Sequence, residues 1–243
     1  MRKIPYITAI IPAAGSGSRL GARVSKPLVE IGNKPLLAHT IRALSVNPLI
    51  RNIIIAANLS NTALIGSIVK RSRFKKVASI VLGGATRRLS VENGLKEVPG
   101  RAEYILIHDA VRPFADQALI NRVIEAAIGS GAAVAGVPVK GTVKRSRPFR
   151  MPVTHKNILV VKETLSRDNL WEIQTPQVFR KSLILKAYER NKDAFVTDDA
   201  MLLEKAGVKV SLVQGSYFNI KITTPEDLIL AQAILEAQKN KNK

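Results

Sequence analysis

The chain has 243 residues, which is enough for one large α/β domain or two small ones with a substantial buried core. Its hydrophobic content of 46% and charged content of 23% are ordinary for a soluble globular protein, and the absence of cysteine excludes disulfides, thiolate metal sites and thiol nucleophiles. The formal net charge of +20 attracts polyanions, but the basic residues are spread along the whole chain and aromatic residues make up only 5%, so the composition does not favour a dedicated single-strand nucleic-acid binder.

The N-terminus begins with positive charge at Arg2 and Lys3, but the apolar stretch that follows is short and runs into a glycine-rich loop. A signal peptide or a membrane span needs a longer apolar segment. We therefore predict no membrane segment and a cytoplasmic protein.

Apolar runs rich in β-branched residues alternate with amphipathic segments along most of the chain, which predicts a three-layer α/β fold with a mainly parallel central sheet. Before residue 139 the predicted strands are 7–11, 52–57, 77–82, 104–108 and 132–138, and the predicted helices are 34–46, 63–69, 86–96 and 118–128. After residue 170 the predicted helices are 182–190, 198–206 and 224–238, and the predicted strands are 208–213 and 219–222.

The first strand ends in the loop Ala13-Ala14-Gly15-Ser16-Gly17-Ser18-Arg19, and Lys26 follows shortly after it. Small residues let the backbone curl around an anion with its N–H groups pointing inward, and two cations just past the loop suit a polyphosphate. The alternative is a tight structural connection, because Leu20 replaces the third glycine of a dinucleotide fingerprint and no P-loop ending is present. The downstream residues must decide between these two interpretations.

Two later strands also end in residues that suit a ligand site. Gly83-Gly84 follows the third predicted strand, and Asp109 follows the fourth. In a parallel sheet all three strand ends meet at the carboxyl edge, where ligands of open α/β sheets bind. Asp109 could be a simple cap or turn former, but its position beside two glycine turns favours contact with a ligand or with Mg²⁺.

Between residues 139 and 170 the α/β rhythm is replaced by short alternating pieces that Gly141, Pro148 and Pro152 interrupt. This pattern predicts a β-hairpin arm that projects from a single domain formed by residues 1–138 and 171–238. An excursion of this length without its own core needs a partner surface, so we predict that the arm packs on a second copy in a homodimer. Residues 239–243 are predicted to form a disordered basic tail.

An ordered set of motifs resembles one family, the 2-C-methyl-D-erythritol 4-phosphate cytidylyltransferases of the non-mevalonate isoprenoid pathway. The resemblance covers nearly the whole chain and implies a Rossmann-like nucleotidyltransferase fold. It also implies transfer of CMP from CTP to a sugar-alcohol phosphate, with Mg²⁺ and release of pyrophosphate. The motifs are Ala13 to Arg19 with Lys26, Gly83-Gly84 with Arg87 and Ser90, His108 to Pro113, Arg167 before Leu170-Trp171, Thr175-Pro176-Gln177, Thr197-Asp198 and Asn219-Ile220-Lys221.

The resemblance also implies residue roles. The transition-state cations would be Arg19 and Lys26, and the substrate-positioning residues would be Arg167 and Lys221. The acceptor would be bound by Thr175 and Thr197, with Arg112 and Thr142 reaching in from the partner's arm, and Asp109 is a tentative Mg²⁺ ligand. The nucleotide-binding residues would be Ala13, Ala14, Gly15, Ser16, Gly17, Gly83, Ser90, Asp109 and Ala110.

Residue chemistry agrees with this assignment. A phosphate monoester is already ionised near neutral pH and can attack the α-phosphorus of CTP without a general base, so fixed cations matter more than histidines. We therefore assign structural roles to His39, His108 and His155. Thr197 could equally be only an N-cap before Asp198.

Two departures from the family pattern concern the acceptor. The lysine segment Ser25-Lys26-Pro27-Leu28 is closer to that of a sugar-nucleotide pyrophosphorylase, and no acid follows Gly84 in Ala85-Thr86-Arg87-Arg88-Leu89. Two alternatives therefore stay open: a cytidylyltransferase for ribitol 5-phosphate or another sugar phosphate, and a non-catalytic basic protein that binds RNA. Pyrophosphate release from CTP distinguishes the second of these from the enzymes.

Overall fold

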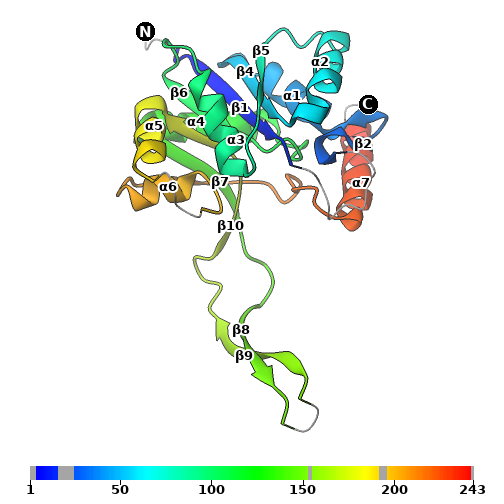
Figure 1. Ribbon diagram of the computed structural model, residues 1–243, viewed down its shortest axis with the longest axis vertical. Helices are drawn as coiled ribbons and strands as arrows, with labels where there is room; N and C mark the ends of the chain where they lie inside the picture. Colours follow the sequence, from blue (N-terminus) through cyan, green and yellow to red (C-terminus); the bar gives the residue numbers. More distant parts are fainter. Residues whose placement is uncertain (1–3, 16–24, 153–154, 192–195, 242–243) are drawn as a thin grey trace.

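The centre of the fold is a seven-stranded sheet with the strand order β11-β7-β10-β6-β1-β4-β5 (Figure 1). The computed structural model describes residues 4–15, 25–152, 155–191 and 196–241. The pairs on either side of β10 are antiparallel, and the other neighbouring pairs are parallel. The strands are β1 (Ile7–Ala13), β4 (Ile50–Ala57), β5 (Val77–Leu82), β6 (Tyr104–Ile107), β7 (Ala132–Pro138), β10 (Trp171–Arg180) and β11 (Ser211–Gln214).

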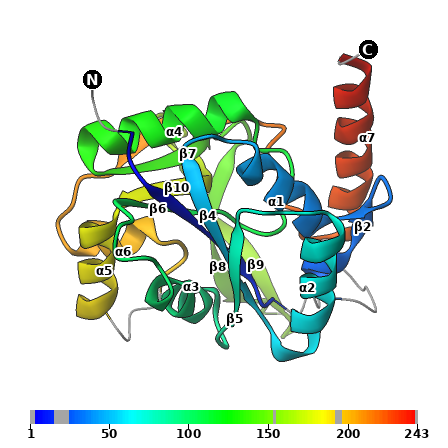
Figure 2. The same ribbon diagram turned by 90° about the horizontal axis from the view of Figure 1, so that it is seen from above.

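Helices cover both faces of this sheet, which confirms the predicted three-layer α/β architecture (Figure 2). Successive side chains of β1 enter opposite layers. Ile11 belongs to the apolar cluster that includes side chains of α1 (Leu36–Ser45), α2 (Thr62–Arg71) and α4 (Gln117–Ser130), and Ile10 belongs to the cluster that includes side chains of α3 (Arg87–Lys96), α5 (Lys181–Arg190) and α6 (Ala200–Lys205). A strand buried on both faces is mostly apolar, and Thr8 is the single polar residue of β1. No helix within the described ranges has the length and apolar character needed to cross a membrane.

A smaller third cluster supports the C-terminal part of the site. Helix α7 (Pro225–Lys241) packs against the short hairpin β2 (Glu30–Ile31) and β3 (Lys34–Pro35), with Ile222 and Ala231 fully buried. The Ile222 N–H donates to the Val111 carbonyl oxygen at 3.0 Å. The segment before α7 is therefore fixed beside the end of β6. The remaining short elements are the 3₁₀ turns η2 (Lys26–Leu28) and η3 (Leu59–Asn61).

The arm is the antiparallel hairpin of β8 (Val143–Arg150) and β9 (Asn157–Leu165), which projects away from the α/β body (Figure 1). This confirms the predicted hairpin. Several of its apolar side chains are exposed in the single chain, with Leu159 at 72% and Val161 at 62% relative exposure. The expected contact of the arm with a second copy stays a prediction.

Several element predictions need correction. Strand β10 was not predicted, because polar residues and Pro176 interrupt its apolar pattern, yet it lies in the middle of the sheet. The strand predicted over 219–222 is wrong: this segment forms no strand and pairs with no strand in the described chain. Helix α7 continues to Lys241, so residues 239–241 of the predicted disordered tail are helical, and residues 242–243 lie outside the described residues.

Candidate active site

Two glycine-containing turns support one another at the carboxyl edge of the sheet. A Cβ atom on Gly83 would lie 2.5 Å from the Ala14 Cβ and 2.9 Å from the Ser90 Oγ, so only glycine fits where the two turns meet. The Ser90 hydroxyl accepts a hydrogen bond from the Gly84 N–H at 3.1 Å and donates to the Thr86 carbonyl oxygen at 3.0 Å. Ser90 therefore fixes the second turn to the start of α3.

The glycine-turn cavity opens between these turns and has a volume of about 480 Å³. Its wall combines backbone from small residues with cationic side chains, which suits an anionic ligand with many phosphate oxygens. The residues that line it are Pro12, Ala13, Ala14, Gly15, Lys26, Pro27, Gly84, Ala85, Thr86, Arg87, Ser90, Asp109, Ala110, Val111 and Lys221.

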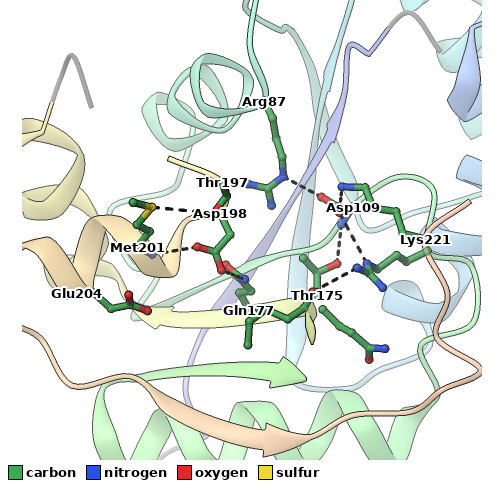
Figure 3. Close-up of a pocket in the computed structure, with 12 residues that line it drawn as sticks. Arg87, Asp109, Thr175, Gln177, Thr197, Asp198, Met201, Glu204 and Lys221 are labelled. Atoms are coloured by element: carbon green, nitrogen blue, oxygen red, sulfur yellow. Dashed lines mark hydrogen bonds and ion pairs between the residues drawn. The ribbon is translucent and has the colours of Figure 1, made fainter. Parts of the chain in front are cut away.

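The threonine cavity adjoins the glycine-turn cavity and has a volume of about 390 Å³, against about 480 Å³ for the glycine-turn cavity itself (Figure 3). Strand β10 and the start of α6 form much of its wall, and hydroxyl, amide and guanidinium groups face its interior. The residues that line it are Arg87, Asp109, Arg112, Ile173, Gln174, Thr175, Gln177, Thr197, Asp198, Met201, Glu204 and Lys221.

Three residues, Arg87, Asp109 and Lys221, line both cavities, and we call them the junction. The Asp109 carboxylate accepts from the Arg87 Nε at 2.9 Å and from the Lys221 Nζ at 2.8 Å, and the Arg112 Nε lies 3.8 Å away. Burial alone would raise the pKa of Asp109, but the positive charges of Arg87, Lys221 and Arg112 hold it well below its usual value. Asp109 is therefore a carboxylate at neutral pH and fixes the cations around it.

The backbone beneath the junction is fixed by Thr175 and His108. The Thr175 hydroxyl accepts from the Asp109 N–H at 3.0 Å and donates to the His108 Nδ1 at 2.9 Å, while the His108 Nε2–H donates to the Arg112 carbonyl oxygen at 3.0 Å. Burial lowers the pKa of His108 to about 4, so its ring is neutral near pH 7. Both ring nitrogens have partners inside the protein, which agrees with the structural role expected for this histidine.

The sequence did not identify the residues that hold Arg87 on its other side. The Arg87 Nη1 donates to the Asp199 Oδ2 at 2.7 Å, and the Tyr188 hydroxyl donates to the Asp199 Oδ1 at 2.5 Å. Asp199 is only 1% exposed. Arg87 belongs to the motif that begins at Gly83-Gly84, and Asp199 follows the motif Thr197-Asp198. The two residues lie 112 positions apart in the chain, and no sequence signal pairs them.

The structure brings most of the predicted site residues to these cavities. Ala13, Ala14, Gly15, Lys26, Ser90, Asp109 and Ala110 line the glycine-turn cavity, Arg112, Thr175 and Thr197 line the threonine cavity, Lys221 lines both, and Gly83 lies directly behind the first. The predicted residues Ser16, Gly17 and Arg19 lie outside the described residues.

Two predicted substrate residues, Thr142 and Arg167, line neither cavity within the single chain. Both are exposed at the base of the arm, where the Arg167 Nη1 donates to the Lys140 carbonyl oxygen at 2.6 Å. Arg112 differs from the expectation that it reaches in from a partner's arm. It is buried in this chain's own threonine cavity, where its Nη1 donates to the Asn219 carbonyl oxygen at 2.7 Å.

A Mg²⁺ ion bound directly to Asp109 does not fit this arrangement. Both carboxylate oxygens of Asp109 already accept from cationic side chains, Arg87 on one and Lys221 on the other. Within the described residues, no group of three or more His, Asp or Glu side chains is placed to hold a metal ion. Mg²⁺ prefers octahedral oxygen ligands and commonly binds through substrate phosphates. The ion pairs of Asp109 do not prevent binding of that kind.

Comparisons with known proteins point to one enzyme family. A family model described as 2-C-methyl-D-erythritol 4-phosphate cytidylyltransferase matches residues 7–237. The chain is 44% identical to a protein of that name from Desulforamulus reducens over 95% of this chain and 96% of the relative, and 42% identical to one from Alkaliphilus metalliredigens over 96% and 95%. The crystal structure of 4-diphosphocytidyl-2C-methyl-D-erythritol synthase from Anaerococcus prevotii covers 96% of this chain and 100% of its own, with 35% identity and a TM-score of 0.79.

Proposed function

From the premise that the chain belongs to the 2-C-methyl-D-erythritol 4-phosphate cytidylyltransferase family, we propose how its two cavities divide the work of the reaction. The protein is a nucleotidyltransferase of the non-mevalonate isoprenoid pathway, which makes 4-diphosphocytidyl-2-C-methyl-D-erythritol and pyrophosphate from CTP and 2-C-methyl-D-erythritol 4-phosphate. The observation that carries the proposal is that the two cavities share Arg87, Asp109 and Lys221.

In the proposed arrangement CTP occupies the glycine-turn cavity and the acceptor occupies the threonine cavity. The small residues of the turns leave room for a triphosphate beside the backbone N–H groups, and Lys26 adds a cation to the same wall. The hydroxyl of Thr197 and the guanidinium of Arg112 suit a polyol and its phosphate. The α-phosphate of CTP and the phosphate of the acceptor then meet at the junction.

The reaction needs no proton transfer by the protein. An ionised oxygen of the acceptor phosphate forms a bond to the α-phosphorus, and the bond between that phosphorus and the oxygen bridging to the β-phosphate breaks as pyrophosphate leaves. The barrier lies in bringing two anions together and stabilising charge on the phosphoryl oxygens. In our proposal Lys26 and Arg19 stabilise that charge, and Lys221, fixed by its 2.8 Å ion pair with Asp109, positions the acceptor phosphate.

We further propose that Mg²⁺ enters the site on the phosphates of CTP and supplies additional positive charge there. The ion pairs of Asp109 support this route, because a metal on Asp109 would have to displace Arg87 or Lys221. An Asp109→Asn variant should then need the same Mg²⁺ concentration for half-maximal activity as the wild type, even though its activity is lower. A large increase in that concentration would instead identify Asp109 as a ligand.

The arm is proposed to join two copies of the chain, so that Thr142 and Arg167 of one copy contribute to the acceptor site of the other. The exposed side chains of Phe149, Ile158 and Leu159 on β8 and β9 support an apolar contact, with relative exposures of 38%, 40% and 72% in the single chain.

 We also propose that the protein is located in the cytoplasm, where CTP is available. Cell fractionation tests this location.

The proposed function is tested by measuring pyrophosphate release from CTP and Mg²⁺ with two acceptors, 2-C-methyl-D-erythritol 4-phosphate and ribitol 5-phosphate. The wild type should turn over the first acceptor with a much higher kcat/KM than the second. Lys221→Ala should lower kcat/KM for the acceptor roughly a hundredfold, because a fixed cation at the reacting phosphate is lost. The matched control Lys209→Ala removes an exposed lysine on another part of the chain and should leave the rate unchanged. Preference for ribitol 5-phosphate, or no release with either acceptor, would contradict the proposal.

A further inference from the structure

Arg87 lies at the boundary of the two cavities and forms ion pairs with Asp109 and Asp199. We propose that Arg87 donates hydrogen bonds to the phosphate groups that meet at the junction, and that Asp199 and Tyr188 are positioning residues that hold its guanidinium in place. This inference rests on the proposed division of CTP and acceptor between the two cavities, and it adds a phosphate-contacting residue to that site.

The first argument is the placement of the guanidinium. Arg87 is the first residue of α3 and reaches from it towards Asp109, at the boundary of the two cavities (Figure 3). Its side chain is 27% exposed, whereas those of Asp109 and Asp199 are 8% and 1% exposed. A guanidinium has five N–H donors, and the two carboxylates take one bond each from Nε and Nη1. Further donors therefore remain for phosphate oxygens in the cavities.

The second argument is the anchor behind Arg87. A buried carboxylate is unfavourable unless charged or hydrogen-bonding partners compensate it, and the partners of Asp199 are Arg87 and the Tyr188 hydroxyl. Burial lowers the pKa of Arg87, but the charges of Asp199 and Asp109 outweigh this effect and raise it, so the side chain stays positively charged. The anchor thus stabilises a cation at one position and in one orientation.

The third argument is what this anchor connects. Arg87 begins α3, which follows the second glycine turn, and Asp199 directly precedes α6, whose first turn carries Met201 of the threonine cavity. The Arg87–Asp199 ion pair therefore joins a wall of the glycine-turn cavity to a wall of the threonine cavity. Since phosphoryl transfer requires the reacting groups to be held in line and close together, this connection suits a positioning function.

The test compares four variants with the wild type in the pyrophosphate-release assay: Arg87→Ala, Arg87→Lys, Asp199→Asn and Tyr188→Phe. Arg87→Ala should lower kcat roughly a hundredfold and Asp199→Asn roughly tenfold, with KM for CTP changing less than about threefold. Arg87→Lys should recover only part of the loss, because an ammonium cannot bridge two carboxylates as a planar guanidinium does. Tyr188→Phe, which removes a single hydroxyl, should give a smaller loss of kcat in the same direction.

Chemical rescue separates a phosphate contact from a structural role. Added guanidinium ion at millimolar concentration should restore part of the Arg87→Ala rate and leave the wild-type rate unchanged. The matched control Glu92→Gln removes a different ion pair of α3, that between Glu92 and Arg88, and should keep wild-type kcat. Circular dichroism identifies any variant that fails to fold, in which case the remaining variants and the rescue carry the test.

The outcomes also separate this inference from the proposed function. No pyrophosphate release by the wild type would reject the proposed function itself. An active wild type with near-normal kcat in Arg87→Ala, or a loss of kcat that guanidinium does not rescue and that Glu92→Gln shares, would overturn the role of Arg87 alone.

Discussion

At the scale of single residues, the account depends on positive charge placed around a transferred phosphate. We predict that Lys26→Ala and Arg19→Ala fold normally but lose roughly a hundredfold in kcat, which corresponds to about 3 kcal/mol of transition-state stabilisation. Steady-state kinetics with CTP measures the loss, and Lys75→Ala, which removes an exposed lysine elsewhere, is the control. Near-wild-type kcat in either variant would refute the assigned role of that residue.

His108 gives a prediction about stability and pH. Its pKa falls from 6.5 in the unfolded chain to about 4 in the fold because the ring is buried. The unfolded state therefore binds more protons, and the contribution of His108 to stability is complete above pH 6.5 and is lost as the pH falls towards 4, by about 3 kcal/mol. Thermal unfolding of the wild type should show a steeper loss between pH 6.5 and 4.5 than that of His108→Gln. Parallel curves for the two proteins would contradict the prediction.

Single residues were predictable from sequence where a local pattern marked them. Asp109 and Gly83 follow apolar strands, and the sequence placed them at the same edge of the sheet, as the structure has them. Asp199 and Tyr188 carry no such local mark, because their partner Arg87 lies more than a hundred positions away in the chain. Their contacts can be identified only from the fold, which brings α3, α5 and α6 together.

At the scale of elements, the two glycine turns determine the shape of the nucleotide side of the site. A methyl group at Gly83 would meet Ala14 at 2.5 Å and Ser90 at 2.9 Å. We predict that Gly83→Ala raises KM for CTP at least about tenfold, since overpacking of this kind typically costs about 1–3 kcal/mol and must shift one of the turns. The matched control Gly100→Ala has open space around the added methyl group and should bind CTP normally. An unchanged KM in Gly83→Ala would mean that the turns do not contact the nucleotide.

Among the elements, the parallel strands and the helices that cover them were predictable, and β5 and β7 have the predicted limits. Strand β10 was not, because Gln174, Thr175 and Gln177 give a central strand the polar sequence of a loop. These side chains are buried and line the threonine cavity. The apolar pattern of the sequence therefore does not predict this strand, because these side chains line the site rather than the hydrophobic core.

At the scale of the whole molecule, the arm predicts a dimer. Leu159 and Val161 are exposed on β9, so replacing both with aspartate should not disturb the single chain but should separate two copies that pack through the arm. Analytical ultracentrifugation should give about twice the chain mass of 26.5 kDa for the wild type and the single mass for the double variant, with reduced activity. The control Asn157→Asp adds one negative charge at an exposed polar position of the same strand. A wild type of single-chain mass would contradict the dimer.

The central claim for the whole molecule is that CTP and the acceptor occupy two cavities that meet at Arg87, Asp109 and Lys221. A crystal structure with an unreactive CTP analogue, Mg²⁺ and 2-C-methyl-D-erythritol 4-phosphate tests it most directly. The account predicts the triphosphate in the glycine-turn cavity and an acceptor oxygen about 3–3.5 Å from the α-phosphorus, beside Lys221. A triphosphate bound in the threonine cavity, or an acceptor bound away from the junction, would contradict it.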